Sequence, residues 1–167
     1  NVHPVRIDNE NDLKVKRLAG KMDRVLVDAP CSGLGTLRRN PELKWRQSET
    51  DIAELSAKQG GILAGAARMV KPGGRLVYAT CSILRYENEV VVRAFLASHP
   101  QFSLLNASEV LGKAGVSLTD AHGTADDDKD FLRLSPHRHG TDGFFAAVMG
   151  FFRKDLVFFA TRFMLFF

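Results

Sequence analysis

The chain is poor in cysteine: Cys31 and Cys81 are the only two among its 167 residues. Two thiols are too few for a disulfide framework, and neither lies in a CxxC or histidine-spaced pair of the kind that holds zinc. We therefore expect a cytoplasmic protein without a metal site. In such a protein, the two thiols need another role.

Long apolar runs are missing too. No uninterrupted run reaches the roughly 18 residues that a membrane-spanning helix needs, and no basic segment followed by an apolar one opens the chain, so we expect no membrane association. With 45% hydrophobic and 25% charged residues, the composition excludes a disordered or collagen-like chain. The net charge of +4 fits a polyanionic partner without requiring one. The chain starts without Met, directly before a strand-like segment, which suggests a fragment.

Apolar runs alternate with segments of helical period. Ser48 or Thr50 is positioned to cap the first long helix, and the run Lys71-Pro72-Gly73-Gly74 ends it. The polar stretch after residue 105 is predicted to be a surface loop. The order predicts an α/β fold with a mostly parallel sheet and helices on both faces. The expected strands are residues 5–7, 22–27, 74–80, 102–105 and 143–149, and the expected helices are 50–70 and 86–98.

Three reactive side chains follow expected strands. Asp28 and Cys31 come after the second strand and Cys81 after the third. In α/β sheets ligands bind beyond the carboxyl ends of the strands, so we expect these residues to face one cleft. The alternative is that each cysteine is a small buried apolar residue and that Asp28 only caps a turn.

Four segments carry a resemblance to a known family: DAPCSGLGTLRRNPELKW at 28–45, KPGGRLVYATCS at 71–82, ENE at 87–89 and DGFFAAVM at 142–149. They resemble the RNA cytosine-5 methyltransferases of the Sun family, most of all its bacterial branch that acts on small-subunit ribosomal RNA. The resemblance implies a partial Rossmann-like class I methyltransferase fold. It also implies methyl transfer from S-adenosylmethionine to carbon 5 of cytosine in 16S ribosomal RNA.

The resemblance also implies catalytic roles. Cys81 would be the nucleophile that adds to carbon 6 of the cytosine, and Cys31 would assist release of the methylated product. Asp28 would hydrogen-bond the cytosine edge and line the cofactor site. Pro30 would keep the loop stiff beside the substrate, unless it is an ordinary turn former.

A basic loop lies next to these motifs. By resemblance Arg38, Arg39 and above all Lys44 contact phosphates or the target base of RNA, although a solvated loop is the usual fate of such a run. Trp45 could stack on a base, but core packing is the favoured interpretation. Residues 137–139 are equally compatible with RNA contact and with an ordinary surface.

The chain departs from the family at both ends. It contains no glycine-rich cofactor loop, so its first expected strand corresponds to the family's third, and Asp8 matches the position that contacts the adenine of the cofactor. We therefore expect residues 1–149 to be the C-terminal portion of the catalytic domain, without the cofactor-loop half. Residues 150–167, with seven Phe in eighteen residues, form an atypical hydrophobic extension. It could be an extra strand, an interface or a non-native addition.

Two other functions stay open. A non-catalytic RNA-binding remnant would keep the basic loop but have no methyl donor. A cysteine hydrolase is disfavoured, because neither cysteine has a histidine partner by motif.

Overall fold

The computed structural model describes residues 2–116 and 130–152. Its helices and strands are those of an α/β domain. In chain order they are α1 (Leu13–Lys16), β1 (Met22–Asp28), the 3-10 turn η1 (Leu34–Thr36), α2 (Leu43–Arg46), α3 (Glu49–Ala67), β2 (Val70–Thr80), the 3-10 turn η2 (Arg85–Glu87), α4 (Glu89–Ser98), β3 (Phe102–Leu105), α5 (Ala107–Lys113), β4 (Phe131–Leu134), α6 (Pro136–His139) and β5 (Phe144–Phe151).

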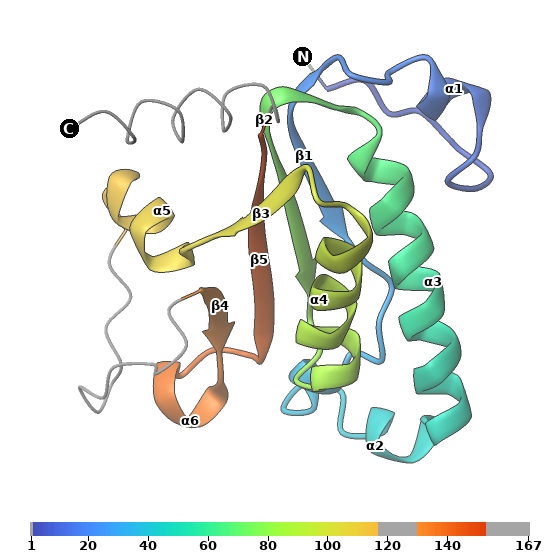
Figure 1. Ribbon diagram of the computed structural model, residues 1–167. Helices are drawn as coiled ribbons and strands as arrows, with labels where there is room; N and C mark the ends of the chain where they lie inside the picture. Colours follow the sequence, from blue (N-terminus) through green and yellow to red (C-terminus); the bar gives the residue numbers. More distant parts are fainter. Residues whose placement is uncertain (1, 117–129, 153–167) are drawn as a thin grey trace.

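The strands form one sheet in the order β1-β2-β5-β3, with β4 also paired to β5 (Figure 1). β1 and β2 are parallel, as expected for strands joined by a helical crossover, whereas β2, β3 and β4 each pair antiparallel with β5. Four strands therefore run in one direction and only β5 runs against them. The prediction of a mostly parallel sheet is correct for strand direction. Most neighbouring pairs are nevertheless antiparallel, because β5 lies between β2 and the two short strands β3 and β4.

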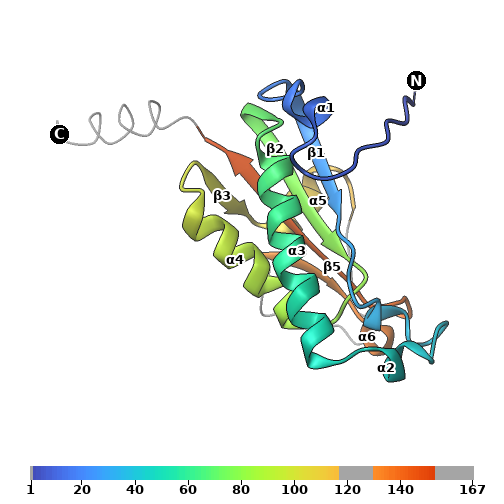
Figure 2. The same cartoon turned by 90° about the vertical axis from the view of Figure 1, so that its right-hand side faces the viewer.

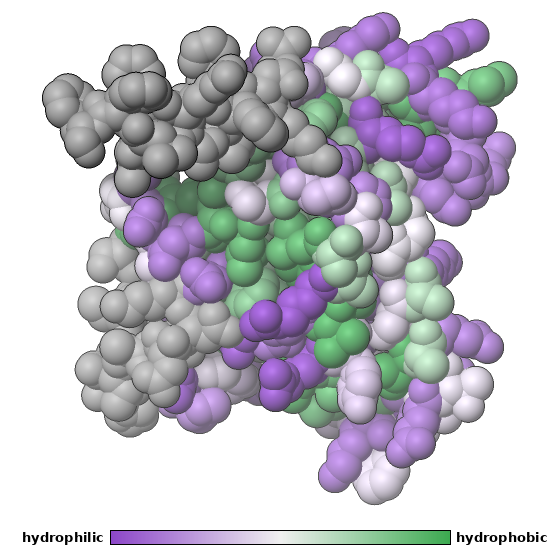
Figure 3. All heavy atoms as spheres, viewed as in Figure 1, coloured by the Kyte–Doolittle hydropathy of each residue, from purple (hydrophilic) through white to green (hydrophobic). Residues whose placement is uncertain are grey.

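Helices cover both faces of the sheet, as predicted. α3 and α4 lie side by side on one face, and the short α5 lies on the other (Figures 1 and 2). The core between sheet and helices contains the fully buried side chains of Leu63, Leu76, Tyr78, Val92 and Met149. In the view of Figure 3, hydrophilic side chains gather around α1, and apolar ones gather over β3 and α4.

The long helix α3 begins where the sequence places a cap. Ser48 is the N-cap: its hydroxyl accepts from the backbone N–H of Asp51, and the Asp51 carboxylate accepts from the backbone N–H of Ser48. Thr50 lies inside the helix. Gly65 allows the close packing expected of it, because a Cβ there would lie 2.7 Å from the Cβ of Glu10. Residues 8–12 therefore rest directly on α3.

Three sequence predictions need correction. Residues 5–7 form no strand, because none of the strands in the described residues pairs with them, and Val5 is 63% exposed. The second long helix starts at Glu89 rather than 86, because Asn88 (φ −113°, ψ −99°) breaks the helical path. The stretch after residue 105 contains α5, β4 and α6 instead of one loop, although residues 117–129 lie outside the described residues.

The C-terminal strand also differs slightly from expectation. β5 continues to Phe151, past the predicted end at residue 149. Of the predicted hydrophobic extension, residues 153–167 lie outside the described residues. No helix in the described ranges is long and apolar enough to cross a membrane. Residues 2–116 and 130–152 also contain no cluster of three His, Cys, Asp or Glu side chains suited to a metal ion.

Candidate functional site

The site lies at the carboxyl ends of β1 and β2, the end of the molecule where α2 and α6 are found (Figures 1 and 2). The parallel register pairs Asp28 with Ala79, and the Ala29 N–H donates to the Ala79 carbonyl at 2.9 Å. The two strands thus end level with each other. The loops that follow bring the sulfur atoms of Cys31 and Cys81 to 3.4 Å.

The two thiols are neither fully buried nor fully exposed. The pKa of Cys31 is raised to about 12: burial is the largest cause, a backbone hydrogen bond from Gly33 opposes it, and the neighbouring Cys81 thiol adds to the rise. Cys31 therefore keeps its proton at neutral pH. Their partial exposure and mutual contact distinguish these residues from small apolar core residues.

Beneath the thiols lies a buried polar network centred on Glu87, whose side chain has no exposed surface. Its carboxylate accepts from the Ser32 N–H at 2.8 Å and from the Ser32 hydroxyl at 2.6 Å. It also accepts from the Ser82 hydroxyl at 2.5 Å. Gln59 of α3 donates to the same carboxylate at 3.1 Å and to the Pro30 carbonyl at 2.9 Å. One carboxylate thus joins both cysteine-bearing loops to α3.

The backbone around Glu87 is held as well. The Tyr78 hydroxyl donates to the Glu87 carbonyl at 2.6 Å, and burial raises the pKa of Tyr78. Thr80 donates to the side chain of Asn88 at 2.6 Å, and that side chain donates to the Ser82 carbonyl at 2.9 Å. The predictions from sequence named none of these residues as functional. The signal that could have found Glu87 and Asn88 is the ENE motif, five residues after Ser82.

Two glycines lock the loops together. The Gly35 N–H donates to the Cys81 carbonyl at 2.9 Å, and the Gly143 N–H donates to the Gly35 carbonyl at 2.8 Å. A Cβ on Gly35 would lie 2.3 Å from the Gly143 carbonyl oxygen, which no real contact tolerates. Only glycine at position 35 therefore allows the two loops to come this close, and this contact holds the Cys81 backbone in place.

The basic loop divides into two parts. Arg38 and Arg39 both contact Asp142, and the Arg39 Nε donates to it at 2.6 Å. Lys44 and Trp45, on α2, point into solvent: Trp45 is 82% exposed, with the Lys44 Nζ 5.1 Å from its ring centre. The prediction that Trp45 packs in the core is therefore wrong, because the surrounding four-residue helix buries none of its side chains.

Residues 137–139 form most of α6. Together with Ser82, Arg85 and Arg133 they line a hollow of about 370 Å³ beside the loop of Cys81. Arg133 pairs there with Glu89 at 2.6 Å. The three residues thus lie next to the site, on a surface rich in cations.

A separate cavity is lined by both residues that were predicted to bind the cofactor. Asp8 and Asp28, both exposed, line a hollow of about 420 Å³ between residues 7–10, β1 and α3. Its remaining wall is largely apolar. Carboxylates beside an apolar wall fit a ligand that combines amino groups with a flat, weakly polar ring.

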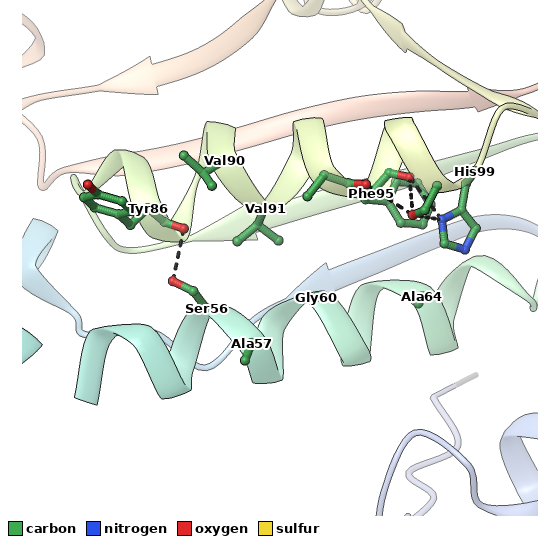
Figure 4. Close-up of a pocket in the computed structure, with 11 residues that line it drawn as sticks. Ser56, Ala57, Gly60, Ala64, Tyr86, Val90, Val91, Phe95 and His99 are labelled. Carbon is green, nitrogen blue, oxygen red and sulfur yellow. Dashed lines mark hydrogen bonds between the residues drawn. The ribbon is translucent and has the colours of Figure 1, made fainter. Parts of the chain in front are cut away.

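A further hollow of about 370 Å³ lies between α3 and α4 (Figure 4). Its wall is mainly apolar; Gly60 leaves room in it, and the Ser56 hydroxyl donates across it to the Tyr86 carbonyl at 3.0 Å. At one end the rings of Phe95 and His99 stack at 4.2 Å. No predicted site residue lines it.

Comparison with known proteins now decides the family. The family model described as 16S rRNA methyltransferase RsmB/F matches residues 2–150. This chain belongs to that family. The prediction of a Sun-type methyltransferase and of the class I methyltransferase fold is therefore confirmed, and S-adenosylmethionine is the cofactor of the family.

Named relatives agree. The chain is 40% identical over 131 residues to the probable ribosomal RNA small subunit methyltransferase B of Bacillus subtilis, covering 77% of this chain and 27% of that protein. It is 42% identical over 126 residues to the Synechocystis protein of the same description, covering 75% and 26%. The chain spans about a quarter of the length of these curated relatives.

Solved structures are similar as well. The crystal structure of PH0851 matches with a TM-score of 0.67 and 44% identity, over 78% of this chain and 27% of that one. NSun6 from Pyrococcus horikoshii, solved with SFG, matches with a TM-score of 0.71 and 27% identity, over 92% and 35%. SFG is an analogue of S-adenosylmethionine.

Proposed function

We propose that this chain performs the covalent step of S-adenosylmethionine-dependent methylation at carbon 5 of cytosine in small-subunit ribosomal RNA. The observation that carries the proposal is the pair of cysteine sulfurs 3.4 Å apart at the carboxyl edge of the sheet. Within the whole enzyme, residues 1–149 are the C-terminal portion of the catalytic domain, and 150–167 are an extension of it. Membership of the RsmB/F family supports this assignment.

The chemistry explains why a thiol is needed. Carbon 5 of cytosine is a poor nucleophile, because its electrons belong to an aromatic ring. The Cys81 thiolate forms a bond to carbon 6, and the electron pair of the carbon 5–carbon 6 double bond moves to carbon 5. S-adenosylmethionine, when bound, supplies the electrophilic methyl group. A water molecule then takes the carbon 5 proton, the electron pair of that carbon–hydrogen bond re-forms the carbon 5–carbon 6 double bond, and the carbon 6–sulfur bonding pair leaves with the Cys81 sulfur, which restores the ring.

Cys31 acts on the last step. Its raised pKa keeps it protonated at neutral pH, so it is a poor nucleophile but retains a proton beside the Cys81 sulfur. When the carbon 6–sulfur bond breaks, the Cys81 sulfur takes the bonding pair, and the Cys31 S–H, 3.4 Å away, donates a hydrogen bond that stabilises the departing thiolate. Release of the product from Cys81 therefore depends on Cys31.

The neighbouring side chains position the two substrates. Asp28, exposed at the end of β1, accepts a hydrogen bond from the cytosine edge, and the Gln59–Pro30 hydrogen bond holds the loop between Asp28 and Cys31 in place. Asp8 and Asp28 would hold S-adenosylmethionine in the cavity that they line, where their carboxylates would accept hydrogen bonds from its amino groups.

RNA is held by the basic loop. Lys44 attracts phosphates from its exposed position, and the neighbouring Trp45 ring offers a stacking surface to a base. Arg38 and Arg39 are already paired with Asp142, so RNA phosphates must compete with this carboxylate for their guanidinium groups. Their contribution to RNA affinity is therefore smaller than that of Lys44.

The two cysteines give the sharpest test. We suggest a chimaera in which residues 2–150 replace the matching part of the Bacillus subtilis relative, with ribosomal RNA and radiolabelled S-adenosylmethionine as substrates. Cys81→Ala abolishes methyl transfer, because no other group at the sheet edge makes carbon 5 nucleophilic. Cys31→Ala instead accumulates a protein–RNA adduct that survives a denaturing gel.

The opposite pattern refutes the assignment. An adduct in Cys81→Ala, or normal turnover without an adduct in Cys31→Ala, means that the roles are reversed or wrong. A folded chimaera that binds RNA but never transfers methyl favours the non-catalytic RNA-binding alternative.

A further inference from the structure

Both cysteines are followed by a serine that bonds to the same oxygen atom. The hydroxyls of Ser32 and Ser82 each donate to Oε2 of Glu87, at 2.6 and 2.5 Å, and they lie 3.3 Å from each other. One residue earlier along each loop, the sulfurs lie 3.4 Å apart. The spacing of the serines beneath the site thus matches the spacing of the thiols within it.

Glu87 is itself anchored outside the two loops. Gln59 of α3 donates to its Oε1, and the hydroxyl of Tyr78, two residues before the end of β2, donates to its backbone carbonyl. The side chain has no exposed surface, so it cannot touch RNA or cofactor. Glu87 is therefore a rigid reference point to which both loops are attached.

A carboxylate is the group that this position requires. Four donors converge on it: the N–H and hydroxyl of Ser32, the hydroxyl of Ser82 and the amide of Gln59. A carboxylate has about four acceptor sites on its two oxygens, whereas a glutamine amide has one acceptor oxygen and an NH₂ group that would face donors. Removing the carboxylate leaves buried donors unsatisfied and the serines without a common partner.

We propose that Glu87 is a positioning residue that sets the approach of the Cys31 and Cys81 sulfurs through Ser32 and Ser82. As a role in catalysis, the inference rests on the proposed function. The geometry itself does not, because the separation of two thiols can be measured without RNA or cofactor.

The test uses the rate of disulfide formation between Cys31 and Cys81 as a measure of the distance between their sulfurs. The full 167-residue chain is treated with diamide, a two-electron oxidant that accepts two electrons and two protons when the thiols form a disulfide. Disulfide closure is followed by counting free thiols. Glu87→Gln is expected to slow closure by about tenfold, the loss expected when a hydrogen bond to a charged group no longer holds the pair together.

Glu89→Gln is the matched control. Glu89 carries the same chemical group two residues away and is also buried, at 5% exposure, but it pairs with Arg133 of β4. This variant is expected to lower the melting temperature and to close its disulfide at the wild-type rate. Wild-type closure in folded Glu87→Gln, or equally slow closure in Glu89→Gln, overturns the proposal.

Milder variants cover the case in which Glu87→Gln does not fold. Ser32→Ala and Ser82→Ala each remove one hydroxyl and leave the carboxylate in place. Each is expected to slow closure, and the double variant to slow it by less than the product of the two, because both act through one partner. Unchanged closure in both single variants overturns the proposal.

Disulfide closure and methyl transfer test the positioning role of Glu87 and the proposed function separately. In the chimaera, Glu87→Gln is expected to lower kcat and to leave the KM for RNA unchanged, because the exposed Lys44 and Trp45 are untouched. If Glu87→Gln slows closure but the wild-type chimaera transfers no methyl group, the proposed function fails and the positioning of the thiols by Glu87 stands.

Discussion

Cys31 holds its proton more tightly than an ordinary thiol does, and its sulfur touches that of Cys81. Burial is the largest cause of the raised pKa of Cys31, and the adjacent Cys81 sulfur adds to it. The second contribution exists only while Cys81 is a free thiol or thiolate. Once Cys81 is bonded to a substrate carbon, its sulfur carries no charge, so this contribution to the raised pKa of Cys31 is lost and the contribution of burial remains.

The raised pKa of Cys31 predicts how this thiol reacts with iodoacetamide. A pKa raised from 9.0 to about 12 lowers the thiolate fraction of Cys31 at pH 8 by about a thousandfold, so Cys31 is alkylated far more slowly than in the unfolded chain. Cys81→Ala lowers the midpoint of the Cys31 pH profile but leaves it above 9, because burial remains. Mass spectrometry of the labelled peptides measures the profile, and a wild-type midpoint at 9 or below contradicts the prediction.

The same shift has a consequence for stability. A raised pKa means that the folded state holds this proton more tightly than the unfolded state does. The stabilisation is present in full below pH 9 and is lost as the pH rises toward about 12. Cys31→Ala removes this part of the alkaline loss, which urea unfolding at pH 8 and pH 10.5 detects.

Some site residues were predictable from the sequence and others were not. Cys31, Cys81 and Asp28 follow apolar β-branched runs, and strand ends are where α/β sheets bind ligands. Gln59 gave a fainter signal: a polar residue on the apolar stripe of α3 indicates a buried hydrogen bond. The prediction for Trp45 was wrong. Large aromatic side chains are usually buried, but Trp45 lies on a short helix whose neighbouring residues are charged.

Among the helices and strands, those with periodicity and caps were predictable. The cap at Ser48 and the apolar stripe of α3 placed that helix to within a few residues, and the apolar run before Thr80 placed most of β2. α1, α2 and α6 have four residues each, too few for any hydrophobic period to appear. β4 was missed because only its first residue, Phe131, is buried.

Alanine is expected to have opposite effects on stability at two glycines, one in the crowded contact between the loops and one in an open part of α5. Gly35→Ala places a Cβ against the Gly143 carbonyl and the Cys81 carbonyl, and is expected to destabilise the protein by about 1–3 kcal/mol. Gly112→Ala, in α5 with nothing within 4 Å, is expected to stabilise it by about 0.5–1 kcal/mol.

Chemical denaturation of the two variants beside the wild type measures both effects. A Gly35→Ala variant as stable as the wild type would show that the loops separate without cost. In that case Gly35 does not fix the Cys81 backbone.

At the scale of the whole molecule, the sequence predicted the class of fold but not the order of the strands. Local patterns identify β5 as a strand, but nothing local indicates that it lies between β2 and β3 and runs against both. Strand order depends on pairings between residues far apart in the chain. The parallel neighbours β1 and β2 were predictable because a right-handed helical crossover joins them.

The affinity for S-adenosylmethionine depends on more of the domain than this one cavity. The cavity has the carboxylates of Asp8 and Asp28, but the 167 residues contain no glycine-rich loop to supply backbone amides to S-adenosylmethionine. We expect residues 1–167 alone to bind S-adenosylmethionine weakly or not at all in calorimetry, and the chimaera to bind it well. Micromolar or tighter binding by the 167-residue chain contradicts this.

The central place of β5 matters for how the chain is made. Among these elements, β1, α3 and β2 leave the ribosome before β3, β4 and β5, and β1 can pair with β2 as soon as β2 has emerged. β3 and β4 emerge next, but within residues 2–116 and 130–152 both pair only with β5, as does the second edge of β2. During synthesis three strands therefore expose unpaired edges until residue 151 leaves the exit tunnel. A nascent chain stalled before that point is a strong candidate for chaperone binding or aggregation.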